Sequence, residues 1–187
     1  SFVQSVTIPD TITTIEYQGF FRCDSLSSIV LPTSLTSIGK EAFSMCSLLK
    51  SVKIPEQIAT IEASTFSGCE GLESVVLPSS LEHIKDGAFK YCHNLNGVKI
   101  PNGVTRISAY TFYENSKLEN LTMHNGVSVI GEYAFSKCTG LKSVSIPSSI
   151  TTIEWNAFNG CKGLKQVSFN GGRMTIIQDN TFCNCTS

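Results

Sequence analysis

Eight cysteines and three histidines are the residues of this 187-residue sequence whose side chains could do chemistry. Thiols and imidazoles can bind zinc, and a thiol beside an imidazole can act as a nucleophile. Seven of the cysteines share one offset of a regular spacing, at which Asn115 stands once: Cys23, Cys46, Cys69, Cys92, Cys138, Cys161 and Cys185. An active site is expected at one place in a chain, so a cysteine repeated in this way indicates a structural role.

The alternatives of a metal site, a disulfide and a catalytic pair have little support in these spacings. The only close cysteine pair is Cys183-x-Cys185, and the three histidines fall at unrelated offsets. The adjacent side chains of Cys92 and His93 would diverge. Side chains stacked about 4.8 Å apart also exceed the usual Cβ separation of a disulfide, about 3.8 Å. We predict free, buried thiols that bond the backbone of the neighbouring turn, with Asn115 donating to a carbonyl in the same way.

No other catalytic pattern is present in the sequence. It has no glycine-rich phosphate loop, no paired carboxylates and no G-x-S-x-G element. The sequence therefore predicts no enzyme, no metal and no cofactor. An enzyme that uses the non-repeat cysteine Cys183 is the remaining catalytic alternative.

The cysteine spacing belongs to a repeat of 23 residues with the consensus L-x-S-V-x-I-P-x-x-I-T-x-I-x-x-x-A-F-x-x-C. All six prolines hold one offset, and phenylalanine holds another in all eight units. The last unit has one extra residue near Asn170-Gly171-Gly172-Arg173, where we expect a bulged corner. The predicted units within a single array over 1–187 are 3–25, 26–48, 49–71, 72–94, 95–117, 118–140, 141–163 and 164–187.

Each unit contains three short segments that predict one coil of a solenoid. Leu72, Val75 and Leu77 alternate as in a strand, which Pro78 ends, and Ile84 marks a second short extended wall. The small residue, Phe and Cys that follow are spaced for a helical or 3₁₀ turn. Because one unit cannot bury its inward face alone, we predict eight stacked coils that are mostly β-structure, with a short parallel strand in each.

The L-x-S-V-x-I-P, T-x-I and A-F-x-x-C elements at this period closely resemble the BspA-like class of leucine-rich repeats, over essentially all of the chain. The resemblance implies a leucine-rich-repeat solenoid. It also implies a secreted or surface-displayed protein of a host-associated bacterium or a protozoan parasite, which attaches to host-surface or matrix proteins. It implies no catalytic residues.

Charge and hydropathy limit the kinds of partner. Lys and Arg number 14 and Asp and Glu 15, so no overall field favours nucleic acid, and no apolar run is long enough to cross a membrane. Since the sequence lacks an initiator Met and polar capping units, we expect a fragment of a longer array. Its uncapped ends suggest end-to-end self-association.

The candidate binding face is the exposed side of the first strands. Lys53, Lys99 and Thr122 occupy one exposed offset, and Lys142 and Lys165 a neighbouring one. These lysines could equally form only a solvated edge that discourages sheet pairing. Alternative anchors are large aromatic residues at otherwise small offsets, Tyr17, Tyr113 and Trp155.

Two sequons occur in the sequence, and both matter only if the chain passes through a eukaryotic secretory route. Asn120, on the strand face, is the candidate glycosylation site. Asn184 is expected to be less accessible, because it lies beside the packed corner.

Two non-enzymatic functions fit this pattern. The first is a protein-binding module for adhesion or host recognition, and the variation at Lys53 and Lys99 favours it. The second is a spacer that holds another domain away from the cell surface. The uniform serine and threonine of the remaining strand face favour the spacer.

Overall fold

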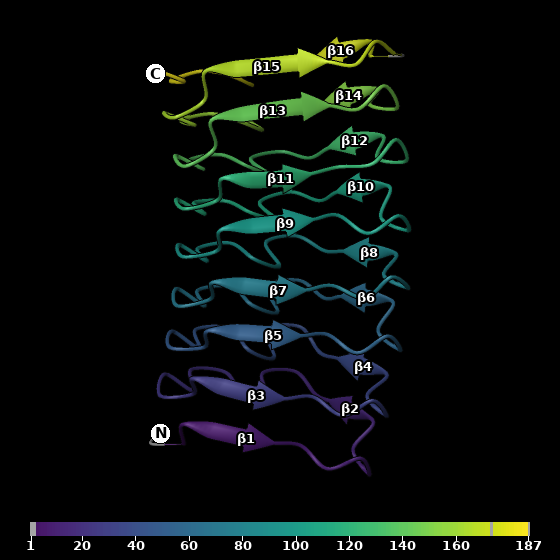
Figure 1. Cartoon of the computed structure of the whole chain (residues 1–187), viewed down its shortest axis with the longest axis vertical. Coiled ribbons are helices and arrows are strands. Elements are labelled where there is room, and N and C mark those ends of the chain that lie inside the picture. Colours follow the sequence, from purple (N-terminus) through teal and green to yellow (C-terminus); the bar gives the residue numbers. More distant parts are fainter. Residues whose placement is uncertain (1–2, 173, 187) are drawn as a thin grey trace.

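The structure is a computed structural model that describes residues 3–172 and 174–186. These residues form a stack of eight coils with two short strands in each coil, and the chain climbs steadily from one end to the other (Figure 1). The first strands of the coils make one wall: β1 (Ser5–Thr7), β3 (Ser28–Val30), β5 (Ser51–Lys53), β7 (Ser74–Val76), β9 (Gly97–Lys99), β11 (Asn120–Thr122), β13 (Ser143–Ile146) and β15 (Gln166–Phe169).

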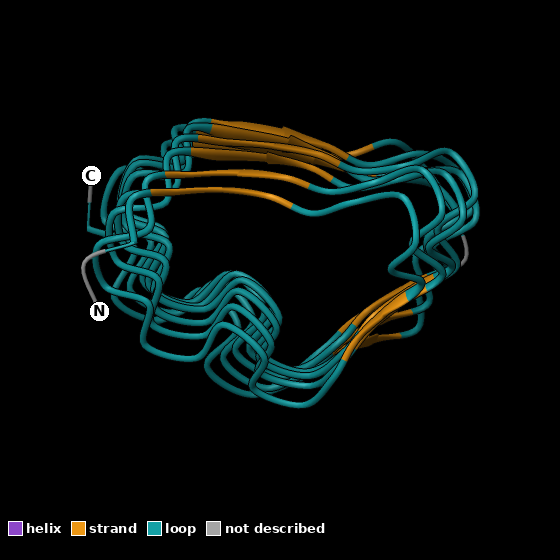
Figure 2. Ribbon diagram, turned by 90° about the horizontal axis from the view of Figure 1, so that it is seen from below, coloured by secondary structure: helices purple, strands orange, loops and turns teal. Residues whose placement is uncertain are grey.

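The second strands make a separate wall, and turns without strands close the third side (Figure 2). This second wall contains two-residue strands: β2 (Thr14–Ile15), β4 (Ser37–Ile38), β6 (Thr60–Ile61), β8 (His83–Ile84), β10 (Arg106–Ile107), β12 (Val129–Ile130), β14 (Thr152–Ile153) and β16 (Ile176–Ile177). The predicted solenoid, with a short parallel strand and a second extended wall in each coil, is confirmed.

Where neighbouring strands are hydrogen-bonded, parallel pairing aligns each residue with its counterpart in the next coil. Ser51 lies opposite Ser74 in the β5–β7 pair, and Ile107 lies opposite Ile130 in the β10–β12 pair. Ile153 pairs with Ile177, one residue beyond the usual repeat. The eighth coil therefore contains the inserted residue at its corner, where Gly171 and Gly172 have φ of 78° and 124°. Arg173 lies outside the described residues.

The interior is a set of columns, each made of one residue type stacked along the axis. Leu72, Ile84 and Phe89 are fully or almost fully buried, as are their counterparts in the central coils. Phenylalanine rings from Phe20 to Phe182 stack with centroids 5.2–5.7 Å apart and interplanar angles of at most 12°. The hydrophobic effect thus acts mainly between coils, because each ring is covered by the rings above and below it.

The third segment is not the helical or 3₁₀ turn that the sequence predicts. Alternate N–H groups leave the coil: those of Glu41, Phe43 and Met45 donate to carbonyls of the next coil at 3.1, 2.9 and 2.7 Å. The intervening N–H groups of Ala42 and Ser44 close local turns three residues back. A helix would use every N–H internally, so this segment is a chain of turns that also forms a ladder between coils.

Two positions in each third segment adopt the left-handed conformation. One is occupied by Gln18, Glu41 and their counterparts, and the other by Arg22, Met45 and theirs, with φ between 52° and 72°. Most of these residues are not glycine, although left-handed φ costs an L-residue roughly 1–2 kcal/mol. Reversing direction at these points aims alternate N–H groups at the next coil, which explains why no helix forms.

The described residues contain no helix, and so none that is long and apolar enough to cross a membrane. The coils at the two ends of the stack expose apolar side chains whose counterparts in the central coils are buried. Ile177 is 51% exposed, whereas Ile153 is fully buried. Val3 and Ile12 are exposed in the first coil.

We expect Phe89→Ala to lower the free energy of unfolding by about 3–5 kcal/mol, because it leaves a cavity between the rings of Phe66 and Phe112. Phe182→Ala is the matched control, since this partly buried ring stacks on Phe158 in the last coil. It should cost less than half as much. Urea unfolding followed by circular dichroism measures both, and equal losses would contradict a stack stabilised by contacts between neighbours.

Candidate binding surfaces

The cysteine column bonds the backbone of the preceding coil, as the sequence predicts. The thiols of Cys46, Cys69 and Cys92 lie 3.1, 3.1 and 3.2 Å from the carbonyl oxygens of Phe20, Phe43 and Phe66. The later coils repeat this contact, and all eight cysteines are free thiols. The column is therefore a set of side-chain hydrogen bonds that tie each coil to its neighbour.

Burial keeps these thiols protonated. It raises the pKa of Cys46 and Cys161 to about 12, and it also raises the pKa of Cys69 and Cys138 well above the ordinary value. The thiolate is the form that attacks electrophiles and binds metals. This environment disfavours both kinds of chemistry.

Asn115 interrupts the column and reverses the predicted direction of its hydrogen bond. Its side-chain oxygen accepts the N–H of Cys92 at 2.9 Å, whereas we expected its amide to donate to a carbonyl. The amide nitrogen is buried and has no partner among the described residues. An amide is larger than a thiol and has two polar atoms, and this corner provides a hydrogen-bond partner for the oxygen alone.

Two of the three histidines, His93 and His124, contact backbone carbonyl groups. The Nδ1 atom of His93 lies 2.8 Å from the carbonyl oxygen of Glu114, and the Nε2 atom of His124 lies 3.1 Å from that of Val104. Within the described part of the chain, no group of three or more His, Cys, Asp or Glu residues is placed to hold a metal ion.

The first-strand wall brings the predicted binding residues Lys53, Lys99 and Thr122 into one exposed column. Thr122 lies directly opposite Lys99 in the β9–β11 pair, and Lys53 lies opposite Val76 in the β5–β7 pair. Lys142 and Lys165 are exposed one residue before β13 and β15. The five residues thus share a wall, with the last two displaced along the strand.

Their electrostatic environments differ. Lys142 lies 3.6 Å from the carboxylate of Glu119, and Lys50 at the same offset lies 3.1 Å from that of Glu73. Among the described residues neither Lys53 nor Lys99 forms an ion pair. The unneutralised positive charge of the column is therefore at Lys53 and Lys99.

Both sequon asparagines are exposed. The amide of Asn120 donates to the side-chain oxygen of Asn96 at 3.0 Å, beside Gly97, where a side chain would crowd Asn120. Asn184 is also exposed, contrary to the expectation that the packed corner would shield it. The last coil described has no further coil over that corner, which explains the difference.

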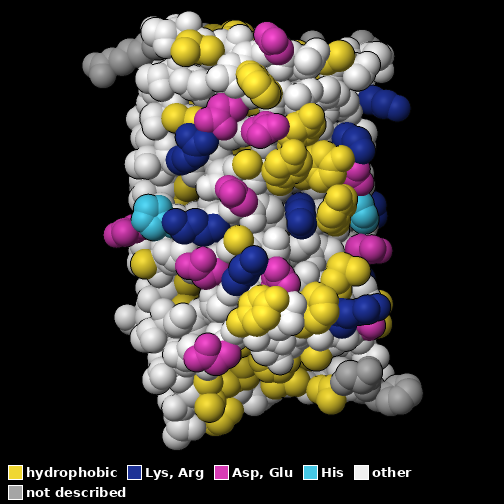
Figure 3. Space-filling model, turned by 180° about the vertical axis from the view of Figure 1, so that it is seen from behind, with side chains coloured by type: hydrophobic (Ala, Val, Ile, Leu, Met, Phe, Trp, Pro, Cys, Tyr) yellow, Lys and Arg dark blue, Asp and Glu magenta, His cyan; other side chains and the backbone are white. Residues whose placement is uncertain are grey.

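The three aromatic candidates do not form one site. Tyr17 and Trp155 are exposed six coils apart at the same offset, whereas Tyr113 lies in a cluster of four tyrosines from three successive coils. In this cluster Tyr110 stacks on Tyr133 with centroids 4.9 Å apart. Figure 3 shows hydrophobic side chains gathered among charged ones on the face behind the view of Figure 1.

The tyrosine cluster has local charges of both signs. Lys137 lies over the Tyr113 ring, 5.2 Å from its centroid, and pairs with Glu114. The Lys137 ammonium lowers the pKa of Glu114, while burial and then the Glu132 charge raise the pKa of Tyr110. Of these three charges, Lys137 offsets Glu114, so a single negative charge remains at Glu132. The sequence gives no simple signal for it, because the tyrosines occupy three different offsets.

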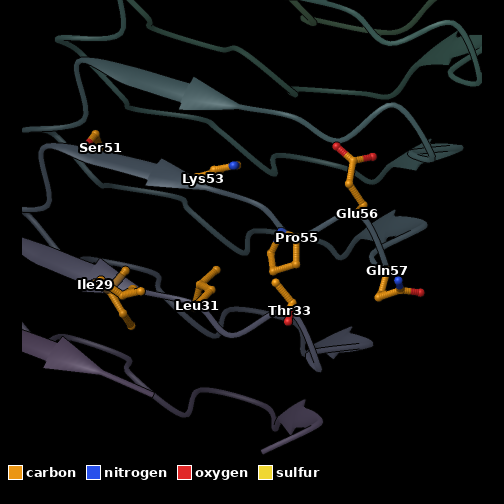
Figure 4. Close-up of a pocket in the computed structure, with 9 residues that line it drawn as sticks. Ile29, Leu31, Thr33, Ser51, Lys53, Pro55, Glu56 and Gln57 are labelled. Carbon is orange, nitrogen blue, oxygen red and sulfur yellow. The ribbon is translucent and has the colours of Figure 1, made fainter. Parts of the chain in front are cut away.

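Two grooves cross the first-strand wall, and the sequence interpretation missed both. The first groove has a volume of about 460 Å³ and contains Val30, Leu31 and Thr33 from one coil and Lys53, Pro55 and Glu56 from the next. Figure 4 shows Leu31 and Thr33 facing Lys53 and Pro55 across these two coils. The second groove, of about 440 Å³, contains Val76, Leu77, Ser79, Lys99 and Pro101, with Glu56 at its edge.

The coil geometry, with one first strand per repeat and stacked leucine, isoleucine and phenylalanine columns, defines a leucine-rich-repeat solenoid. The family model described as BspA type leucine rich repeat region matches residues 1–118 and 105–187 in six copies. The chain belongs to this family, and its fold is that of a protein-interaction module.

Solved structures support the same assignment. A leucine-rich repeat protein from Bacteroides ovatus superposes with a TM-score of 0.87 at 30% identity, over 98% of this chain and 47% of that one. A leucine-rich repeat protein of T. pallidum gives a TM-score of 0.63 at 26% identity, over 93% of this chain and 70% of that one. This chain thus spans about half the length of the Bacteroides protein. No curated protein sequence matches it.

We expect Asn115→Cys to raise the free energy of unfolding by about 1 kcal/mol, because it removes a buried, unpaired amide and restores the thiol contact. Cys138→Asn, the reverse change in the next unit of the same column, should destabilise the chain. Thermal and urea unfolding measure both. A loss of stability in Asn115→Cys would show that the amide has a role that this interpretation lacks.

Stability should fall at alkaline pH. A thiol with a raised pKa in the folded chain stabilises it fully below the unfolded value of 9.0, and that contribution is lost as the pH rises toward about 12. Each such thiol can lower the free energy of unfolding by up to about 1.4 kcal/mol per pH unit in this window. Urea unfolding at pH 8 and pH 10 measures the loss, and Cys46→Ala with Cys161→Ala should make it smaller. An unchanged slope would exclude these thiols as its cause.

Proposed function

We propose that this array is a non-enzymatic protein-binding module of a surface-displayed or secreted protein, which acts in adhesion or host recognition through its first-strand wall. Family membership supports the display and the class of partner, a protein of a host surface or extracellular matrix. The stacked core supports the role mechanically, because it holds the strands of the wall in a fixed register.

The observation that carries the proposal is the composition of the wall between β3 and β9. Val30 and Val76 are 60% and 56% exposed, next to Lys53 and Lys99. A spacer needs only a solvated surface, and the Ser and Thr residues of the later strands would suffice for it. Exposed valines with apolar grooves beside them are more typical of an interface than of a purely solvated surface.

The proposed face extends to Thr122, Lys142 and Lys165, which continue the same wall. A glycan on Asn120 would cover part of this face beside Thr122. The spacer remains the alternative function.

Lys53→Glu with Lys99→Glu should abolish capture of a protein from a host-cell surface and matrix extract, because it reverses the unpaired charges of the wall. Lys40→Glu with Lys85→Glu, at two exposed lysines outside the first-strand wall, is the matched control with the same change in net charge. Pull-down followed by mass spectrometry measures capture, and circular dichroism checks the fold. A protein retained by the wild type and the control but lost by the first variant supports the module. Capture of no protein by the wild type would favour the spacer.

A further inference from the structure

The backbone of the first-strand wall repeats in every coil, but between β3 and β9 its exposed side chains repeat in every second coil. Strand residues Val30 and Val76 are followed by Leu31 and Leu77, whereas Lys53 and Lys99 are followed by isoleucine. The two grooves use the same positions of this longer repeat, since Val30, Leu31, Thr33, Lys53 and Pro55 of the first recur two units later as Val76, Leu77, Ser79, Lys99 and Pro101. The wall therefore offers nearly the same pocket twice.

Each groove lies where the hydrogen bonds between neighbouring first strands stop. The N–H groups of Ile8 and Ile54 donate to the carbonyls of Val30 and Val76 in the next coil at 3.1 and 3.0 Å. The equivalent N–H groups of Leu31 and Leu77 have no partner within the described ranges, and β3–β5 and β7–β9 are not hydrogen-bonded as strand pairs. Each groove thus combines an apolar floor with a backbone donor free to bond a ligand.

Lys53, Lys99 and Glu56 are the charged side chains that line the two grooves, so the grooves together have a net charge of +1. Lys53 and Lys99, one per groove, have no ion pair among the residues that the structure describes. Glu56 lies between the grooves, and its carboxylate accepts hydrogen bonds from the N–H and hydroxyl of Ser79 at 3.0 and 2.9 Å. The lysines therefore favour an acidic group on whatever occupies the grooves.

We propose that the two grooves together bind one peptide segment in the polyproline II conformation, with an apolar side chain at every third residue and acidic side chains between them. This inference rests on the proposed function and names its partner. Two coils at roughly 4.8 Å each place the grooves about 10 Å apart. A polyproline II chain rises about 3.1 Å per residue with three residues per turn, so every third side chain points the same way about 9.3 Å apart.

The other regular conformations fit less well. A β-strand places side chains of one face about 6.7 Å apart, so it cannot fill both grooves in step. An α-helix spans the distance with residues seven apart, but its residues three and four along would lie against Glu56, which lines both grooves. Its carbonyls are also used internally. Polyproline II has no internal hydrogen bonds, so its carbonyls can accept from Leu31 and Leu77.

The first test uses a synthetic peptide with four Leu-Pro-Glu repeats and a fluorescent label, titrated with the whole chain and followed by anisotropy. A peptide of the same composition in which no two leucines are three residues apart tests the spacing, and one with Lys in place of Glu tests the charge. We expect saturable binding of the first peptide and at least about tenfold weaker binding of the other two. Equal binding of all three peptides, or of none, would overturn the proposal.

Variants locate the binding site. Val30→Thr with Val76→Thr should weaken binding about tenfold by removing apolar contact in both grooves. Both valines are exposed, so we expect the fold to be unchanged, and circular dichroism checks it. Ser145→Thr, at the position two units beyond Lys99, is the control and should leave binding unchanged. Unchanged binding by the valine variant would overturn the site.

A gain of binding completes the test. Thr122 and Ser145 lie two units beyond Val76 and Lys99, and Pro147 stands where Pro55 and Pro101 stand. Thr122→Val with Ser145→Lys should build a third groove, so that a peptide of six repeats binds about fivefold more tightly than it binds the wild type. No gain would overturn the groove chemistry. If the peptides fail while Lys53→Glu with Lys99→Glu still abolishes protein capture, the proposed function stands and this inference does not.

Discussion

The whole array depends on hydrogen bonds that leave one coil and end in the next. In the third segment every second N–H donates across the stack, and the cysteine thiols reach back to the coil before. The left-handed residues are the local cost of this arrangement, since only a reversal at these points directs the donors outward. A single coil would have neither partners for these groups nor cover for its phenylalanine. The stack is therefore the smallest unit that satisfies its own backbone.

Much of this architecture can be predicted from the sequence, because residues at the same position of each repeat have the same surroundings in the stack. Phe89, Ile84 and Cys92 each identify a column, and a column of identical residues in a solenoid can only point inward or outward along its whole length. The direction of the thiol contact also follows, since a weak donor at a tight corner faces a carbonyl of the neighbouring coil. The exposed strand positions follow from alternation within each strand.

The features that the sequence did not predict depend on backbone geometry or on contacts between different offsets. The third segment has the spacing of a helical turn, and its left-handed positions contain residues such as Gln18, Glu41 and Tyr110 in place of a consistent glycine. Asn115 was misassigned because the choice between its oxygen and its nitrogen depends on space at the corner. The alternation of Val30 and Lys53 is visible in the sequence. The grooves could not be predicted from it, because their position depends on where the hydrogen bonds between neighbouring first strands are missing.

Valine and lysine alternate from coil to coil at one exposed position of the first strands from β3 to β9, so this part of the array has a two-coil period on its surface as well as a one-coil period in its core. Gain or loss of one repeat keeps the core columns intact, because every coil offers the same residues to its neighbours. The same event placed between β5 and β7 would move the two grooves from an even to an odd separation, so a rigid ligand that fits both would then fit only one. Gain or loss of two repeats changes the separation by a full period. The fold thus tolerates gain or loss of a single repeat, whereas the spacing of the grooves is preserved only when repeats are gained or lost in pairs.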